Sequence, residues 1–202
     1  MLAPNDTTAD ALLPAALLDA PVAGSNLAAG DDGAATLRDQ LAGDRPTLLA
    51  AVRHFGCIFC REMVKDLRTA AEVADRGAER RYPKVVFVHM AAPEAGARFF
   101  GKLWPAAPAI SDPDRRLYDA LGSRRGGWWQ MFRPVVWLHG WRALRKGHRV
   151  GRPIGDPWRM PVLMLVEPTP AGDAAMRPAH AFAHAGSRPA YDRLCDEACS
   201  MD

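Results

Sequence analysis

Two hydrophobic patterns alternate along the chain. Residues 47–55, 84–91 and 160–168 are nearly continuous apolar runs, as expected of strands that are buried on both faces. In 57–74 and 93–104 the apolar residues instead recur every three or four positions, which places them on one face of a helix. The alternation predicts an α/β fold, in which a central sheet with parallel strands is flanked by helices.

Shorter segments complete the predicted fold. Thr36 is the expected N-cap of a helix within 31–46, and Asp112 that of a helix over 112–122. An amphipathic helix is predicted over 134–146, and an antiparallel partner for 160–168 over 176–186. The remaining elements are an edge strand within 17–24, a strand over 108–111 and a closing helix over 187–199.

The chain is predicted to form one domain. Residues 1–17 are rich in Ala, Thr and Asp and are expected to be a flexible N-terminal arm. Residues 18–202 then form a single domain, interrupted by an insertion at about 123–160 that contains five of the six tryptophans and many arginines. That insertion is expected to cover the core, to shape a substrate pocket over the cleft, or to dock on a membrane surface or a partner.

Composition narrows the functional class. The chain has 202 residues, is 49% hydrophobic and carries a formal net charge of +3, which is too small to indicate nucleic-acid binding. Neither a signal peptide nor a run long enough to cross a membrane is recognisable, so a cytoplasmic, reducing location is expected. In such a compartment a Cys-x-x-Cys pair is more often catalytic or metal-binding than a structural disulfide.

Cys57 and Cys60 form the Cys-x-x-Cys pair, directly after a predicted strand and at the start of a predicted helix. A helix N-terminus favours an anion, so the pKa of Cys57 is expected to lie below the free value of about 8.5. Cys57 is then the exposed attacking thiolate, and Cys60, half-buried one turn on, closes a disulfide with it. Arg53 and His54 add positive or polar character beside the pair.

A second motif supports a redox site. Met160 and Pro161 stand immediately before an apolar strand, and in thioredoxin-like folds a cis-proline at that place faces the cysteine pair. Pro161 is therefore expected to be cis and, with Met160, Arg53 and His54, to line the substrate groove.

The strings VRHFGCIFCREMVKDL, AISDPDRRLYDALG and GDPWRMPVLMLV, followed by AHAFAHAGSRPAYDRL, resemble the AhpC/TSA-like branch of thioredoxin-fold proteins. These are the peroxiredoxin-like proteins that include the prostamide/prostaglandin F synthase relatives, and the resemblance covers roughly residues 34–195. It implies a peroxiredoxin-like thioredoxin fold, with Cys57 as the N-terminal redox cysteine and Cys60 as its partner. It also implies a thiol-dependent antioxidant or reductase without a bound cofactor, a peroxide or disulfide as substrate, and an external dithiol of thioredoxin or glutathione type as reductant.

One departure from that family bears on the reaction. Peroxiredoxins carry Pro-x-x-x-Thr/Ser-x-x-Cys, in which the hydroxyl and an arginine hold the peroxide, whereas here His54 stands three residues before Cys57. Thiol–disulfide exchange is chemically nearer than efficient peroxide reduction to what these residues provide.

Two other interpretations stay open. A zinc site needs four ligands, and Cys195 and Cys199 are the only further cysteines, at a helical spacing that lacks the usual turn; the sequence predicts no metal. The same two cysteines could instead resolve or relay the oxidised site. The chain could also be a non-catalytic thioredoxin-fold binding module that uses the Trp-rich insertion as its interface. Glu62 and Lys65, just after the pair, are expected to be solvated helix residues.

Overall fold

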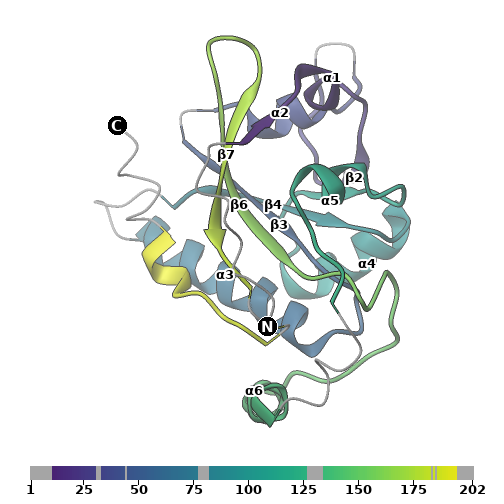
Figure 1. Ribbon diagram of the computed structural model, residues 1–202, viewed down its shortest axis with the longest axis vertical. Coiled ribbons are helices and arrows are strands. Elements are labelled where there is room, and N and C mark those ends of the chain that lie inside the picture. Colours follow the sequence, from purple (N-terminus) through teal and green to yellow (C-terminus); the bar gives the residue numbers. More distant parts are fainter. Residues whose placement is uncertain are drawn as a thin grey trace.

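A mixed seven-stranded sheet runs through the part of the chain that the computed structural model describes, residues 11–30, 33–43, 45–76, 82–126, 134–182, 184 and 186–194 (Figure 1). Its strands are β1 (Ala11–Leu13), β2 (Ala23–Ser25), β3 (Thr47–Ala51), β4 (Lys84–His89), β5 (Ala109–Ser111), β6 (Val162–Pro168) and β7 (Ala174–His180). Their order is β1-β7-β6-β3-β4-β5-β2, with β3, β4 and β5 parallel and every other pair antiparallel.

Helices cover both faces of the sheet. They are α1 (Ala15–Leu18), α2 (Leu37–Leu41), α3 (Ile58–Arg76), α4 (Pro93–Leu103), α5 (Arg116–Ala120), α6 (Pro134–Arg145) and a 3₁₀ turn over Tyr191–Arg193. The predicted central mixed sheet with flanking helices is therefore confirmed. None of the helices in the described ranges has the length and apolar character needed to cross a bilayer.

Alternate residues of the central strands feed two separate cores. Leu48 and Ala50 of β3 pack with α3 and α4, whereas Leu49 and Ala51 pack with α1, α2 and α5. All five β3 residues are buried, as the continuous apolar run predicts. The end of α3 that carries the cysteines thus follows a strand that is packed on both faces.

Two expectations about the elements are corrected, and a third falls partly outside the described residues. Residues 11–13 pair with β7 and 15–18 form α1, so most of residues 11–17 belongs to the folded layers; the rest of the predicted arm, 1–10, lies outside the described residues. The helix expected from 112 begins at Arg116, because the Asp112 carboxylate accepts the N–H groups of Arg116 at 3.0 Å and Tyr118 at 3.1 Å. Of the closing helix only the 3₁₀ turn is described. The single-domain assignment of 18–202 stays a prediction.

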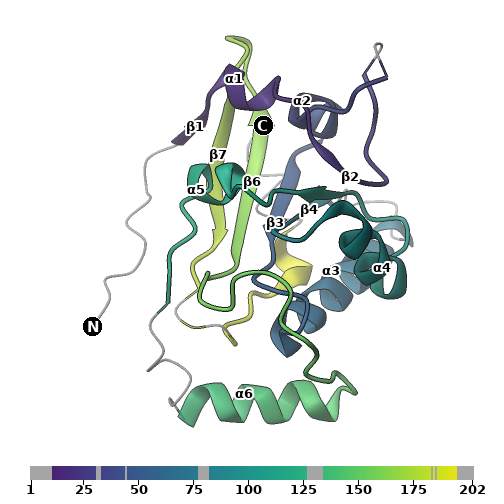
Figure 2. The ribbon, with the colours of Figure 1, turned by 90° about the vertical axis from the view of Figure 1, so that its right-hand side faces the viewer.

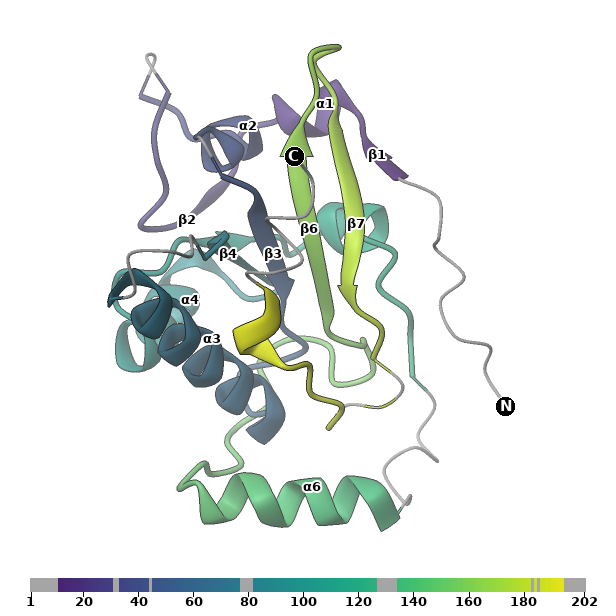
Figure 3. The ribbon, with the colours of Figure 1, turned by 90° about the vertical axis from the view of Figure 1, so that its left-hand side faces the viewer.

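Helix α6 stands apart from the sheet. Figures 2 and 3 show it lying across one end of the molecule, beyond the N-terminal half of α3. The 134–146 prediction of an amphipathic helix is therefore confirmed, and the helix contacts the body mainly through α3.

Candidate functional site

The cysteine pair occupies the junction between β3 and α3. After β3, the Val52 N–H donates to the carbonyl of Val88 at 3.0 Å, and the chain then leaves the sheet. A turn follows, in which the Cys57 N–H donates to the His54 carbonyl at 3.0 Å. The Cys57 carbonyl accepts the N–H of Arg61 at 3.2 Å, which makes Cys57 the N-cap residue of α3.

Both thiols are reduced and buried. Cys57 is 5% exposed and Cys60 2% exposed, and neither forms a disulfide. The expected exposure of Cys57 and half-burial of Cys60 are therefore wrong. The reason is a loop that covers the junction: the Gly151 N–H donates to the Gly56 carbonyl at 3.0 Å, next to the N-cap.

The two thiols titrate in opposite directions. The pKa of Cys57 falls to about 6, because the Cys60 thiol donates a hydrogen bond to it; Arg53 and the N–H groups of Cys60 and Phe59 add to this and outweigh burial. The pKa of Cys60 is raised well above its ordinary value by donating that bond, by burial and by the negative charge of Cys57. The site thus holds one thiolate and one thiol near neutral pH.

Arg53 supplies the positive charge. Its Nη1 lies 3.9 Å from the sulfur of Cys57, and its backbone N–H donates to the sulfur of Cys60 at 3.4 Å. The rest of the guanidinium is fixed by two carbonyls, since Nε donates to Arg159 at 2.8 Å and Nη2 donates to Pro157. Arg53 therefore reaches both sulfurs from a position held by the loop that precedes β6.

His54 contributes no charge. Burial, and then the charge of Arg53, lower its pKa to about 4, so the ring is neutral at neutral pH. Its Nδ1 has no hydrogen-bond partner among the described residues. His54 therefore adds no positive charge beside the thiolate, and of the two residues only Arg53 supplies a cation.

Glycines allow the covering loop to approach. A Cβ on Gly56 would lie 2.2 Å from the carbonyl oxygen of Gly151, and one on Gly155, at φ +116°, would lie 2.8 Å from that of Arg53. The Phe55 N–H also donates to the Ile154 carbonyl at 3.0 Å. This loop belongs to the 123–160 insertion, which was expected to cover the core or the cleft; the sequence analysis missed only its direct backbone contact with the cysteine turn, for which the three glycines were the available signal.

Pro161 lies near Cys60, in the lining of the same pocket, but its peptide bond is not as predicted. The described residues contain no cis peptide bond, so Pro161 is trans, the ordinary preference of an X–Pro bond. Its predecessor is held in place: the Met160 N–H donates to the Arg124 carbonyl at 2.8 Å, and the Met160 carbonyl accepts the Ser123 hydroxyl at 2.9 Å.

A small pocket opens on the Cys60 side of the site, with space of the order of a single water molecule. Pro161 and Cys60 line it. The other lining residues are Phe59, Glu62, Met63, Arg142, Phe182, Gly186, Ser187, Arg188 and Tyr191. Cys57, Met160, Arg53 and His54 are not among them, so the structure brings only Pro161 of the predicted groove residues to this pocket.

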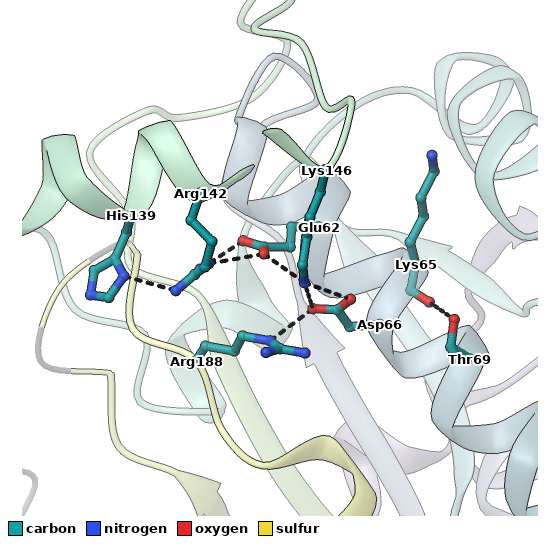
Figure 4. Close-up of polar contacts among 8 residues, drawn as sticks. All are labelled: Glu62, Lys65, Asp66, Thr69, His139, Arg142, Lys146 and Arg188. Atoms are coloured by element: carbon teal, nitrogen blue, oxygen red, sulfur yellow. Dashed lines mark hydrogen bonds and ion pairs between the residues drawn. The ribbon is translucent and has the colours of Figure 1, made fainter. Parts of the chain in front are cut away.

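Glu62 is buried rather than solvated, which corrects the expectation for it. Its carboxylate accepts Arg142 Nη2 at 2.8 Å and lies 3.0 Å from Lys146 Nζ (Figure 4). Burial by itself raises the pKa of Glu62, but the hydrogen bonds and charges of these two cations outweigh it and lower that pKa. Lys65, by contrast, is exposed as expected.

The described residues include no group of three His, Cys, Asp or Glu side chains placed to hold a metal ion. Cys195 and Cys199, which the zinc and relay interpretations require, lie outside the described residues.

Comparison with known proteins identifies the fold. No protein-family model and no curated protein sequence matches the chain. Among solved structures, it is similar to the bacterioferritin comigratory protein of Xanthomonas campestris, in a structure described for alkyl peroxide reduction activity, with 17% identity, a TM-score of 0.59 and coverage of 97% of this chain and 99% of that one. It is also similar to peroxiredoxin Q of the same organism, with 17% identity, a TM-score of 0.57 and coverage of 94% and 95%. The chain therefore has a peroxiredoxin-like variant of the thioredoxin fold.

Proposed function

We propose that the chain is a thiol-dependent oxidoreductase in which Cys57 is the nucleophile and Cys60 the resolving thiol. The observation that carries this proposal is the opposite direction of the two pKa shifts within one hydrogen-bonded pair. A pKa of about 6 makes Cys57 largely thiolate at neutral pH, while Cys60 keeps the proton that the second step must release.

The reaction that these residues support best is thiol–disulfide exchange. The Cys57 thiolate attacks one sulfur of a substrate disulfide, forms a mixed disulfide and expels the other sulfur as a thiolate. Cys60 then loses its proton and attacks the Cys57 sulfur, which expels the second substrate thiolate and leaves a Cys57–Cys60 disulfide. The substrate gains two electrons from the pair. An external dithiol then reduces the Cys57–Cys60 disulfide and is itself oxidised to a disulfide.

The first step prepares the second. While Cys57 is a thiolate, its charge helps to keep the pKa of Cys60 high. The mixed disulfide carries no such charge, so the pKa of Cys60 falls once the substrate is attached. The Arg53 N–H, 3.4 Å from the Cys60 sulfur, stabilises the thiolate that forms there.

Peroxide reduction is the second candidate, and the fold and the burial of Cys57 favour it. A peroxide is small enough to reach a sulfur that is 5% exposed. The thiolate would take one oxygen to give a sulfenic acid and release water or an alcohol; Cys60 would then displace water and form the same disulfide. Against this route, His54 replaces the hydroxyl residue of the peroxiredoxin pattern and is neutral.

Alkylation and turnover test the proposal together. We expect one thiol to react with iodoacetamide at a rate that rises through about pH 6, and Cys57→Ser to abolish both this reaction and turnover of a small disulfide. Cys60→Ser should accumulate the mixed disulfide. A Cys195→Ser/Cys199→Ser double variant is the control and should keep turnover; its loss would favour the relay interpretation instead.

Two results distinguish the alternatives. Peroxide consumption that is much faster than disulfide turnover assigns the peroxidase reaction. If no thiol reacts below about pH 8 and Cys57→Ser changes no measured activity, the oxidoreductase proposal is wrong and the binding-module interpretation takes its place.

A further inference from the structure

Helix α6 presents its apolar residues to solvent. Trp137 is 70% exposed, Leu138 67%, Trp141 63% and Leu144 50%. Positions 137, 141 and 144 are one or two turns apart, with 138 beside them, so the four side chains share one face of the helix. We call these four residues the α6 outer face.

The opposite side of α6 holds the helix to the protein. Arg142 and Lys146 turn toward α3, where Glu62 accepts both and Asp66 lies 3.3 Å from Lys146 Nζ (Figure 4). Ala143, on that inner side, is fully buried. The usual orientation of an amphipathic surface helix is therefore reversed, because its charges anchor it and its apolar face points away from the body.

Exposed arginines end α6 and follow it in the chain. Arg145 lies at the end of α6, and Arg149 and Arg152 follow in the next loop; all three are exposed. None of them makes an ion pair within the described ranges, in contrast to Arg142. The apolar face of α6 is thus followed along the chain by three exposed cations that have no carboxylate partner among the described residues.

We propose that the α6 outer face docks on an anionic lipid bilayer. Tryptophan favours the membrane–water interface, where its ring is buried and its N–H stays hydrated. Leucines on the same face enter the acyl boundary, and each arginine near the surface gains about 1 kcal/mol from anionic headgroups. The helix lies in the interface plane, while the ion pairs to Glu62 keep it attached to the catalytic domain.

The charge argues against a second copy as the occupant. In a symmetric pair of α6 helices the same patch meets itself, so one contact would gather the exposed Arg145 side chains of both copies. Like charges at such a contact repel, whereas an anionic bilayer neutralises them. An acidic protein surface has the same sign as the bilayer, and the experiment separates the two.

The test is co-sedimentation of the full chain with vesicles of phosphatidylcholine that contain about a third phosphatidylserine. We expect binding that is lost with pure phosphatidylcholine and at about 0.5 M salt, together with a blue shift of tryptophan fluorescence. Trp141→Ser/Leu144→Ser should weaken binding at least about tenfold, and Arg145→Gln/Arg149→Gln about 30-fold. The matched control, Leu12→Ser/Val73→Ser, removes two exposed apolar side chains elsewhere and should bind as the parent does.

Three outcomes overturn the proposal. One is that the α6 variants and the control bind vesicles equally. Another is a dimer in analytical ultracentrifugation that Trp141→Ser/Leu144→Ser dissolves, which assigns the face to self-association. The third is binding to an acidic polypeptide such as polyglutamate, sensitive to the same variants, without binding to vesicles. Thermal unfolding of each variant must match the parent, so that lost binding reports the surface and not the fold.

Discussion

Helices α3 and α6 are both amphipathic, yet the protein uses them in opposite ways. In α3 the apolar side, with Met63, Val64 and Leu67, is almost completely buried against the sheet. In α6 the apolar side, with Trp141 and Leu144, faces solvent. A periodic apolar pattern therefore predicts that a helix forms, but it does not predict that the apolar face is the one that packs against the protein.

The contact between the two helices explains the reversal. Glu62 lies on α3 two residues after Cys60, and it is buried beside Arg142 of α6 and Lys146, the residue that follows α6. An unpaired buried carboxylate is costly, so α6 has to turn Arg142 and Lys146 inward. That requirement leaves only the outward direction for the tryptophans and leucines.

The largest expected difference comes from shortening one leucine in each helix. Leu67 is fully buried, so Leu67→Ala should lower the free energy of unfolding by about 3 kcal/mol. Leu144 is 50% exposed, and Leu144→Ala should change the free energy of unfolding by less than about 0.5 kcal/mol. Urea unfolding measures both. Equal losses would mean that α6 buries its apolar face in solution, contrary to the structure.

Removing the central carboxylate should have the next largest effect. Glu62→Gln leaves Arg142 and Lys146 facing a neutral amide and should cost about 2 kcal/mol at neutral pH. Glu72→Gln is the control: Glu72 pairs with Arg68 at 2.6 Å, but both side chains are more than 40% exposed, and about 0.5 kcal/mol or less is expected.

The same comparison predicts a pH dependence. The pKa of Glu62 is lowered in the folded protein from its ordinary 4.5, so its stabilisation is complete above that value and is lost as the pH falls through the folded pKa. The difference between parent and Glu62→Gln should shrink below pH 4.5. If the difference in the free energy of unfolding stays constant down to about pH 3, the charge of Glu62 does not hold α6 against α3.

A smaller effect is expected at the thiol end of α3. Arg53→Gln removes the cation 3.9 Å from the Cys57 sulfur and should raise the pKa of Cys57 by about one unit, so that alkylation at pH 6 slows about fivefold. Arg61→Gln is matched in position and chemistry: its guanidinium donates to the Phe55 carbonyl at 3.1 Å but does not contribute to the pKa of Cys57. It should leave the profile unchanged.

The smallest effect concerns the outer cation of the contact. Lys146 is 36% exposed, and Lys146→Met should cost about 0.5 kcal/mol, which rising salt reduces in the parent. Lys65→Met, at an exposed position of α3, should cost nothing measurable in the same urea titration. A Lys146 effect as large as that of Glu62→Gln would show that the two cations are not interchangeable partners.

The sheet could be predicted from the sequence because its central strands are buried on both faces. Residues 48–52 are all apolar and leave no polar side for solvent, so their burial follows from the sequence, and the confirmed order of strand and helix places Cys57 at the N-cap. The burial of Cys57 could not be predicted in this way. It depends on the backbone of Gly151 and Ile154, about a hundred residues later in the chain. Contacts between backbone atoms do not require particular side chains, so the glycines that allow them are their only sign in the sequence.

The lowered pKa of Cys57 agrees with the prediction, but the states of its charged neighbours could not be predicted, for a related reason. Arg53 and His54 are neighbours, but the carbonyls of Pro157 and Arg159 fix the position of the Arg53 guanidinium, whereas burial makes His54 neutral. Glu62 looked like any charged residue of a helix because its partners are 80 residues away. The roles of Cys57, Cys60 and Pro161 stay predictions that the variants above can decide.

Tyr118 ties the cysteine junction to the far side of the sheet. It belongs to α5, in the core opposite α3, and its hydroxyl donates to the carbonyl of Val52 and, at 2.9 Å, to that of Val88. Val52 is the residue directly before Arg53. The Tyr118 hydroxyl therefore helps to fix the position of Arg53 relative to Cys57 from the opposite face of the sheet. Substitutions in that layer should change the reactivity of Cys57 before they unfold the protein.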